Sequence, residues 1–235
     1  MKRTVILSTN NNPNYLNYVP YVQKAWNKLG WNTLTFTFGT TVSTQDPINN
    51  MIDMTFSTPG YRSETIVQCA RLLGHRFTDG LLMTSDIDMM PCSDYWCPNE
   101  NKVTVYGFDL TERSQYPICY IAMKSENWDK VIPEMSLIEL LSKFPNAKSD
   151  NWNKWWSIDQ QIITQRINEL VPNELLDLND RGFTRSKGFN AKLAKGRIDR
   201  HNWDTTFHNL DAKIDAHMPR PFNRKEAEKV LKLLK

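Results

Sequence analysis

The sequence predicts an α/β fold in which a mostly parallel central sheet is flanked by helices. Short β-branched segments alternate with helical segments in the first ninety residues, and the apolar run 81–83 is followed closely by two carboxylates. Alternation of strands and helices is typical of a parallel sheet wound with right-handed crossovers. The 235 residues are enough to bury one substantial core, so we expect a single domain.

The first half of the chain reads as a β-α-β unit followed by a second helix and strand. Thr4–Leu7 forms a short strand, and Pro20 and Gly30 mark the start and the end of a helix. Alternating apolar residues over 34–38 predict the next strand. A second helix begins near Tyr61. Its apolar stripe consists of Ile66, Ala70, Leu73 and Phe77.

The second half contains two further strands and three helices. We expect strands over 103–108 and 117–123, and an amphipathic helix over 128–141. Ser157 followed by Gln160 matches a capping box, which predicts a helix from there to Leu170. The apolar residues of 224–235 predict a C-terminal helix that docks on the domain.

Asp86 and Asp88 are the most informative residues of the chain. They follow the apolar run Leu81–Met83 and precede a second apolar patch, Met89–Pro91. In an α/β sheet, ligands bind at the carboxyl ends of strands. Residues two apart on an extended chain point the same way, so both carboxylates can face one hard divalent cation. Two solvated aspartates in a turn are the alternative.

Composition and motifs exclude several other classes of protein. The net charge is +3 and the basic residues are scattered, so we expect no nucleic-acid partner. No apolar run is long enough for a membrane anchor. The four cysteines lack zinc-site spacing, and reduced thiols predict a soluble, cytoplasmic protein. Glycine signatures of dinucleotide folds and P-loops are absent.

Asp159 lies in the first turn of a predicted helix, where the helix dipole favours its ionised form. Trp152, Trp155 and Trp156 precede it. Aromatic rings beside a carboxylate are typical of sugar-binding clefts, although tryptophans also pack in cores. Further along the chain, His217 lies in a proline-bounded loop before the docking helix, and His75, His201 and His208 are rival ligands.

Together these residues resemble those of the metal-dependent nucleotide-sugar glycosyltransferases with a GT-A (Rossmann-like) fold. The resemblance rests on the Asp-x-Asp segment 85–91, on Ile158–Gln160, and on the segments 69–72, 116–120, 197–200 and 215–221. It covers residues 4 to about 222. The sequence is most similar to small soluble glycosyltransferases of large DNA viruses of algae, including a rhamnosyltransferase domain. If the chain is viral, its compartment is the host-cell cytoplasm.

The resemblance implies a role for each candidate residue. Asp86, Asp88 and His217 would bind Mn²⁺ (or Mg²⁺), which in turn holds the diphosphate of the donor. Asp159 would be the catalytic base of an inverting enzyme, with Asp109 in reserve. A retaining enzyme would instead use Asp159 or Gln160 to hold the donor sugar. The donor-binding residues implied are Ser8, Thr9, Asn10, Arg62, Arg71, Asp86 and Arg200.

We therefore expect transfer of a sugar from a nucleotide-diphosphate donor, UDP-rhamnose among the candidates, to a glycan hydroxyl. Residues 1–91 would form the nucleotide-sugar-binding half, 92–222 the acceptor-binding half and 223–235 a C-terminal helix. Two alternatives remain at this point. One is a metal-dependent phosphoesterase or nucleotide hydrolase, and the other is a non-catalytic glycan-binding module.

Overall fold

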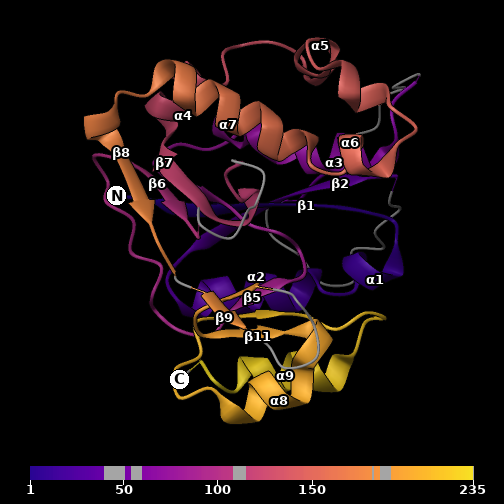
Figure 1. Ribbon diagram of the computed structural model, residues 1–235, viewed down its shortest axis with the longest axis vertical. Helices are drawn as coiled ribbons and strands as arrows, with labels where there is room; N and C mark the ends of the chain where they lie inside the picture. Colours follow the sequence, from indigo (N-terminus) through magenta and orange to yellow (C-terminus); the bar gives the residue numbers. More distant parts are fainter. Residues whose placement is uncertain (40–50, 54–59, 108–114, 182, 186–191, 235) are drawn as a thin grey trace.

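A central sheet of seven strands organises the computed structural model, which describes residues 1–39, 51–53, 60–107, 115–181, 183–185 and 192–234 (Figure 1). The strand order is β3-β2-β1-β4-β7-β6-β8. Neighbouring strands are parallel except at β7, which runs antiparallel to both β4 and β6. The strands are β1 (Arg3–Asn10), β2 (Asn32–Phe38), β3 (Met51–Asp53), β4 (Leu81–Thr84), β6 (Val103–Tyr106), β7 (Ile121–Lys124) and β8 (Leu176–Asn179).

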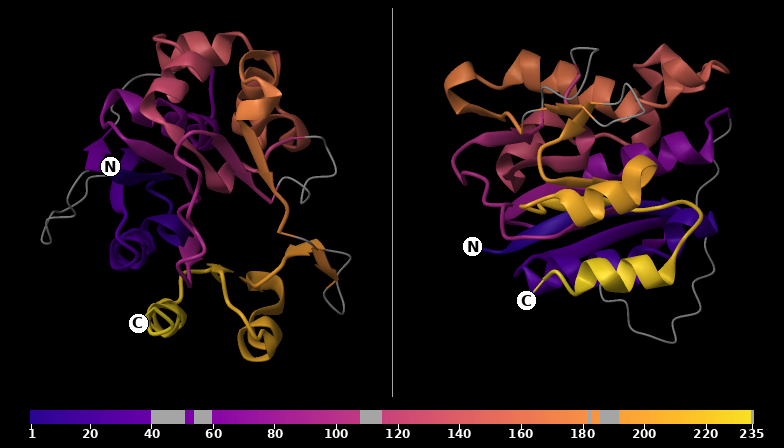
Figure 2. Two further views of the ribbon diagram at one scale, coloured as in Figure 1. Left: turned by 90° about the vertical axis from the view of Figure 1, so that its left-hand side faces the viewer. Right: turned by 60° about the horizontal axis from the view of Figure 1, so that its bottom comes forward.

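Helices cover both faces of this sheet, and Figure 2 shows the layers from two further sides. Helices α3, α4, α5 and α7 contribute to the core on one face, and α2 and α9 contribute to the core on the other. The described helices are α1 (Pro13–Leu16), α2 (Val19–Lys28), α3 (Ser63–Ala70), α4 (Ser125–Val131), α5 (Leu137–Ser142), α6 (Trp152–Trp155), α7 (Ile158–Leu170), α8 (Trp203–Asn209) and α9 (Arg224–Leu231).

Strand β1 shows why the core has two halves. Val5 and Leu7 pack in the cluster on the α2 side, whereas Ile6 between them packs in the cluster on the α3 side. Side chains of a strand alternate between its two faces, so a strand that is apolar throughout must be covered on both. All three side chains are at most 1% exposed.

A smaller sheet, with the strand order β11-β12-β5, lies near helices α8 and α9, in the lower part of Figure 1. Its strands are β11 (Arg197–Asp199), β12 (Asp215–His217) and β5 (Met89–Pro91). Strands β9 (Phe183–Arg185) and β10 (Lys192–Ala194) form a separate antiparallel pair. Because β5 follows β4 so closely, the chain passes from the large sheet to the small one through residues 85–88.

Helix α9 docks against α2, as its apolar stripe predicts. Ala227 and Val230 are fully buried, and the Nζ of Lys28 donates a hydrogen bond to the carbonyl of Leu234 at 2.8 Å. At the other end of α2, Tyr18 accepts a hydrogen bond from the backbone N–H of Asn223. The C-terminal helix is therefore part of the same folded unit as the first helical layer.

Three predicted elements differ from the structure. The helix over 128–141 is wrong, because Pro133 separates α4 from α5; proline lacks the N–H that a helix interior needs. The strand over 117–123 begins only at Ile121, after a 3₁₀ turn. The helix from Tyr61 changes to a 3₁₀ helix at Arg71, and Phe77 is 53% exposed.

The predicted capping box at Ser157 and Gln160 is also wrong. Ser157 has no capping hydrogen bond from its side chain; its Oγ accepts from the Nε2 of Gln161 instead. The chain does contain a capping box, but it lies at Ser136 and Glu139, at the start of α5. Within the described residues, no helix has both the length and the apolarity that crossing a bilayer requires.

Candidate active site

A cavity of about 650 Å³ opens where β1 and β4 end, and most of the predicted site residues line it. Its walls come from the end of β1 and the segment after it, from α3, from the turn after β4, from α6 and α7, and from the end of β12. The lining residues are Ser8, Thr9, Asn10, Asn12, Tyr15, Glu64, Val67, Gln68, Arg71, Asp86, Ile87, Asp88, Ile118, Trp152, Trp155, Trp156, Asp159, Gln160, Arg200, His217 and Arg220.

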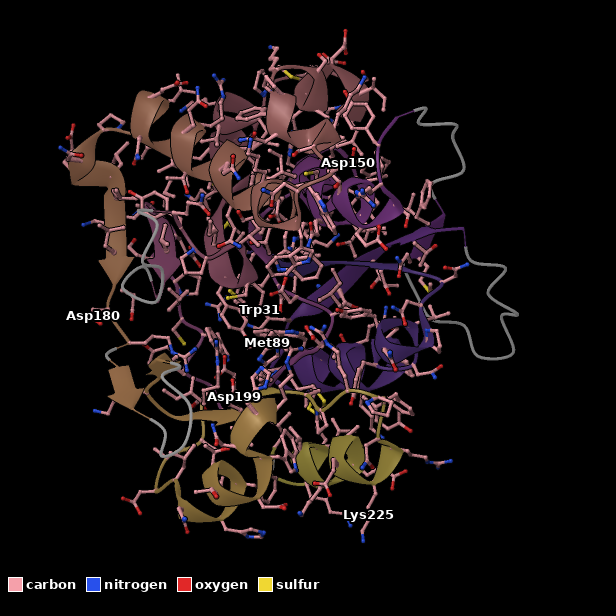
Figure 3. All side chains as sticks on the ribbon, turned by 45° about the vertical axis from the view of Figure 1, so that its right-hand side comes forward. Trp31, Met89, Asp150, Asp180, Asp199 and Lys225 are labelled. Carbon is pink, nitrogen blue, oxygen red and sulfur yellow. The ribbon has the colours of Figure 1, made fainter. Side chains whose placement is uncertain are left out.

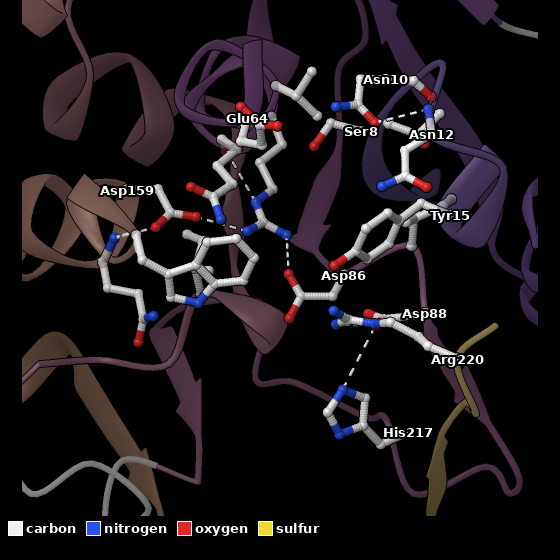
Figure 4. Close-up of a pocket in the computed structure, with 18 of the residues that line it drawn as sticks. Ser8, Asn10, Asn12, Tyr15, Glu64, Asp86, Asp88, Asp159, His217 and Arg220 are labelled. Carbon is white, nitrogen blue, oxygen red and sulfur yellow. Dashed lines mark hydrogen bonds and ion pairs between the residues drawn. The ribbon is translucent and has the colours of Figure 1, made fainter. Parts of the chain in front are cut away.

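Asp86 and Asp88 both face this cavity, but from a turn rather than from an extended chain. The N–H of Met89 donates to the carbonyl of Asp86 at 3.1 Å, which closes the turn between β4 and β5. Figure 4 shows Asp86 between Asp159 on one side and Asp88 on the other. The Asp86 side chain is 38% exposed, whereas that of Asp88 is 6% exposed.

Arg71 joins Asp86 to Asp159. Its Nη1 pairs with Oδ1 of Asp86, and its Nη2 donates to Oδ2 of Asp159 at 2.6 Å. Arg71 and Asp159 are 4% and 1% exposed. Burial raises the pKa of Asp159, and the positive charge of Arg71 opposes that shift only in part. Burial therefore acts on the pKa of Asp159 in the direction opposite to the helix dipole, which favours the ionised form.

Asp88 is surrounded by positive charge. Its Oδ2 accepts hydrogen bonds from Nη1 of Arg200 at 2.9 Å and from Nη2 of Arg220 at 2.8 Å. Nε2 of His217 lies 3.6 Å from the same oxygen. Burial acts to raise the pKa of Asp88, but His217 and the two arginines outweigh it and hold that pKa below its usual range.

His217 lies on strand β12, not in the loop that the flanking prolines suggested. It pairs with Met89 of β5 on one side and with Asp199 of β11 on the other, and Figure 3 labels both of these neighbours. The N–H of Met218 donates to the carbonyl of Asp88 at 2.8 Å, so the backbone holds the histidine beside the carboxylate.

Asp199 is a site residue that the sequence did not reveal. Its Oδ2 lies 3.4 Å from Nδ1 of His217, and its Oδ1 accepts from the N–H of His201 at 2.9 Å. A carboxylate on one ring nitrogen of a histidine orients the ring and turns the other nitrogen toward a ligand. Nothing in the segment 197–200 signals this contact, because it depends on the pairing of β11 with β12.

Two other residues were missed for a similar reason. Arg220 lies in the segment 215–221 but was given no role from the sequence, and Tyr15 was not singled out. In the structure the guanidinium of Arg220 lies 4.4 Å from the centre of the Tyr15 ring, and both line the cavity. Their positions in sequence are 205 residues apart, so no local pattern could connect them.

Some predicted residues lie elsewhere. Arg62 does not line the cavity: its guanidinium pairs with Asp150 at 3.0 Å and lies over the ring of Trp155. The rival histidines also lie outside the cavity lining; all four histidines fall within the described residues, and His217 alone lines it. Asp109 lies outside the described residues.

The chemistry of the donor set fits a divalent cation, although the described residues contain no preformed group of three ligands. Within that part of the chain, Oδ2 of Asp86 and Oδ1 of Asp88 accept no hydrogen bond, and both side chains line the cavity with His217. Two carboxylates and an imidazole suit Mn²⁺.

Several solved glycosyltransferases have a fold similar to that of this chain. GlyE of Streptococcus pneumoniae TIGR4 gives a TM-score of 0.56 at 12% identity, over 100% of this chain and 60% of that one. An active-site mutant of LgtC gives 0.50 at 9% identity, over 98% and 94% of the two chains. A glycosyltransferase involved in glycosylating the major capsid of PBCV-1 gives 0.45 at 12%, over 98% and 99%.

The likeness to GlyE and LgtC shows the fold, and it confirms the predicted GT-A class with a mainly parallel sheet flanked by helices. The chain spans 60% of the length of the GlyE chain. No protein-family model matches the sequence, and no curated protein matches it either. Function must therefore be argued from the site itself.

Proposed function

We propose that this protein is a glycosyltransferase that moves a sugar from a nucleotide-diphosphate donor to a hydroxyl of a glycan. The observation that carries the proposal is the composition of the cavity on this fold. Asp86, Asp88 and His217 lie beside Arg71, Arg200 and Arg220, at the sheet edge where α/β folds bind ligands. Its volume also suits a ligand of this size.

The nucleoside of the donor belongs at the β1 end of the cavity. Ser8, Thr9 and Asn10 supply backbone and side-chain polar groups there, and Tyr15 supplies an aromatic ring. The diphosphate then lies next to Arg200 and Arg220, whose guanidiniums match phosphate oxygens in geometry and charge. We favour UDP-sugars as donors, UDP-rhamnose among them.

Asp86, Asp88 and His217 are the residues that would hold Mn²⁺ (or Mg²⁺). When bound, the cation supplies positive charge next to the departing diphosphate. The chain's own contribution comes from Arg200 and Arg220. As the bond to the sugar breaks, negative charge grows on the nucleotide diphosphate, and two fixed guanidiniums stabilise that charge more in the transition state than in the ground state.

Asp159 fits a positioning role better than the role of base. Its two oxygens accept from Nη2 of Arg71 and from the N–H of Gln160, and the residue is 1% exposed. A general base must reach the proton that it removes, and the bonds from Arg71 and from the N–H of Gln160 occupy part of the accepting capacity of Asp159. We propose that Asp159 holds Arg71 in place beside Asp86. Asp109, which lies outside the described residues, then becomes the candidate for the base of an inverting course.

The two alternative functions are less well supported. A phosphoesterase built on Asp86 and Asp88 agrees with the charges of the cavity, but GlyE and LgtC, whose folds are similar, are glycosyltransferases. A purely glycan-binding module would not need three arginines around two carboxylates. Neither alternative explains why the aromatic and the charged groups line one cavity.

The test is a thermal-shift screen of UDP-sugars, UDP and simple phosphoesters, with Mn²⁺ or with EDTA, followed by a transfer assay on the best donor. Ligands that bind only the native state raise its melting temperature. We expect UDP-sugars with Mn²⁺ to give the largest shift. Asp88→Asn should abolish the Mn²⁺-dependent part of it, whereas Asp94→Asn, an exposed aspartate outside the cavity lining, should not.

A different result would contradict each part of the proposal, the sugar transfer and the role of the metal. Hydrolysis of phosphoesters without any UDP-sugar binding would replace transfer by the phosphoesterase alternative. Equal donor binding in EDTA and in Mn²⁺ would remove the metal from the proposal but leave sugar transfer standing, with Arg200 and Arg220 as the diphosphate ligands.

A further inference from the structure

Trp152 is exposed in a way that the other tryptophans are not. All eight tryptophans fall within the described residues, and Trp152 is the most exposed of them, with 53% of its surface accessible. Leaving an indole ring in water forfeits the free energy of burying it. A large exposed aromatic side chain at the edge of a cavity is therefore a candidate for contact with a ligand.

The Trp152 ring continues into an aromatic wall of the cavity. It stacks on the ring of Trp156, with centroids 5.3 Å apart and planes inclined by 21°, and Trp155 meets Trp156 edge-on at 5.7 Å. All three line the same cavity as Asp159 and Gln160. The wall thus presents flat apolar faces next to polar side chains.

Hydrogen bonds and a cation–π contact hold this aromatic wall in place. Nε2 of Gln161 donates to the carbonyl of Lys154 at 3.1 Å and to Oγ of Ser157 at 3.3 Å, which ties α6 to α7. Trp155 is 7% exposed, and the guanidinium of Arg62 lies 5.3 Å from its ring centre. A surface that is ordered before binding loses little conformational entropy when a ligand arrives.

The wall lies away from the end assigned to the nucleoside. Figure 4 shows Asp159, the neighbour of the wall in sequence, on the opposite side of Asp86 from Tyr15 and Asn10. A donor whose nucleoside lies at Tyr15 and whose diphosphate lies at Asp88 directs its sugar toward Asp159 and Gln160. The aromatic wall then faces the space beyond the reacting carbon, where the second substrate must enter.

We propose that Trp152 and Trp156 form an acceptor subsite that binds a pyranose ring of a glycan. The ring's C–H face stacks on the indoles, and its hydroxyls bond to Gln160 and Glu64, which line the same cavity. Aromatic faces attract the slightly positive edges of C–H groups, and carboxylates and amides bind hydroxyls. The occupant is thus a pyranoside with a continuous C–H face. Only the identification of the bound sugar as the acceptor substrate rests on the proposed function.

The test measures sugar and nucleotide binding separately. Methyl β-D-glucopyranoside, methyl β-D-galactopyranoside and methyl α-L-rhamnopyranoside are titrated by saturation-transfer NMR and tryptophan fluorescence, and UDP is titrated by calorimetry. We expect Trp152→Ala to weaken binding of the best glycoside about three- to tenfold, the loss of one stacking contact. Trp152→Ala/Trp156→Ala should weaken it further, and Trp152→Phe should retain most of it.

Phe77→Ala is the matched control, because Phe77 is also 53% exposed but does not line the cavity. It should leave glycoside binding unchanged, and all variants should bind UDP within about twofold of the wild type. If Trp152→Ala weakens UDP binding but not glycoside binding, the wall holds the nucleobase and the inference is overturned. A wild-type protein that binds none of the glycosides overturns it as well.

Failure of this inference can be told apart from failure of the proposed function. Glycoside binding that depends on Trp152, in a protein that binds no UDP-sugar, would retain the subsite and remove the transferase. Transfer of a UDP-sugar that is unaffected by Trp152→Ala, in both the rate and the KM for the glycoside, would retain the transferase and remove the subsite.

Discussion

Asp159 combines deep burial with a direct bond to Arg71, and this combination separates the two roles considered for it. If Asp159 holds Arg71 in place, Asp159→Asn should weaken donor binding, because Arg71 loses the partner that aligns it with Asp86. If Asp159 is the base, the same change should lower kcat by orders of magnitude and leave donor affinity intact. We expect the first result, with a rise in the Kd for UDP of about tenfold.

The measurement is a calorimetric Kd for UDP alongside steady-state kcat and KM. Asp150→Asn is a suitable control, since Asp150 is exposed and pairs only with the equally peripheral Arg62 among the described residues. Unchanged UDP affinity with transfer lost would restore Asp159 as the base.

A second prediction at the scale of single residues concerns Asp215 and the free energy of unfolding. Its carboxylate is fully buried between Arg181 and Arg197, with contacts of 3.0 and 2.8 Å. Removing one partner of a buried ion pair leaves uncompensated charge and costs about 3–5 kcal/mol. Asp215→Asn should therefore lower the free energy of unfolding by about this amount, measured by urea denaturation at pH 7.

The same residue predicts a pH dependence. Burial acts to raise the pKa of Asp215, but Arg181 and Arg197 outweigh it and hold that pKa below the usual 3.8. A carboxylate of this kind stabilises the fold above its unfolded pKa and loses that contribution as the pH falls toward its folded pKa. Below about pH 4 the wild type should lose stability faster than Asp215→Asn. Parallel pH curves would contradict this, and Asp211→Asn, at an exposed site, is the control.

Strand β12 is the element on which the site depends most. It brings His217 to Asp88, and both of its edges are paired, with β11 on one side and β5 on the other. Central strands of a sheet open rarely, because their hydrogen bonds are shielded from water. We therefore expect residues 215–218 to be protected from hydrogen exchange in the absence of any ligand.

Hydrogen-exchange mass spectrometry on the free protein checks this, with 172–175, all four of whose residues are exposed, as the reference segment. Rapid exchange over 215–218, slowed by UDP and Mn²⁺, would contradict the expectation. It would instead indicate that this segment becomes ordered only when donor binds.

At the scale of elements, the sequence predicted what depends on local pattern. Strand β1, helix α2 with its end at Gly30 and strand β4 all appear where the periodicity places them. The wrong predictions concern residues whose local structure is determined by tertiary contacts. Ile118 lies in a 3₁₀ turn although its neighbours read as one strand, and Ser157 gives its oxygen to Gln161 rather than to the helix backbone.

Only those residues of the candidate site that form a strong local sequence pattern could be predicted. Asp86 and Asp88 stand out because two carboxylates follow an apolar strand. Their partners could not be predicted in the same way, because Arg71 and Asp159 are 88 positions apart and Asp88 and Arg220 are 132 positions apart. Such contacts are set by sheet order and helix packing, and neither leaves a periodic trace in the sequence.

At the scale of the whole molecule, the two halves expected from the sequence share both sheets. Strand β4 from residues 1–91 pairs with β7 from the second half, with Leu82 opposite Met123. Strand β5 pairs with β12, with Met90 opposite Ala216. All four of these side chains are fully buried. Neither half can bury its share of the core without the other.

We therefore predict that the chain unfolds as one unit and that neither fragment folds alone. In the intact protein, far-UV circular dichroism and tryptophan fluorescence should give the same urea midpoint, as a single cooperative transition requires. Separately produced fragments 1–91 and 92–235 should give poorly dispersed NMR spectra, because cutting the chain leaves the edge of β4 unpaired and its apolar side chains in water.

Mixing the two fragments provides the control, since the interface that they share is the interior of both sheets. Recovery of a dispersed spectrum on mixing would show that the fragments are competent to fold and lack only each other. A fragment 1–91 that melts cooperatively and binds UDP on its own would contradict the prediction. It would make the nucleotide-binding half a separate domain, with Asp88 able to take its place without Arg200, Arg220 or His217.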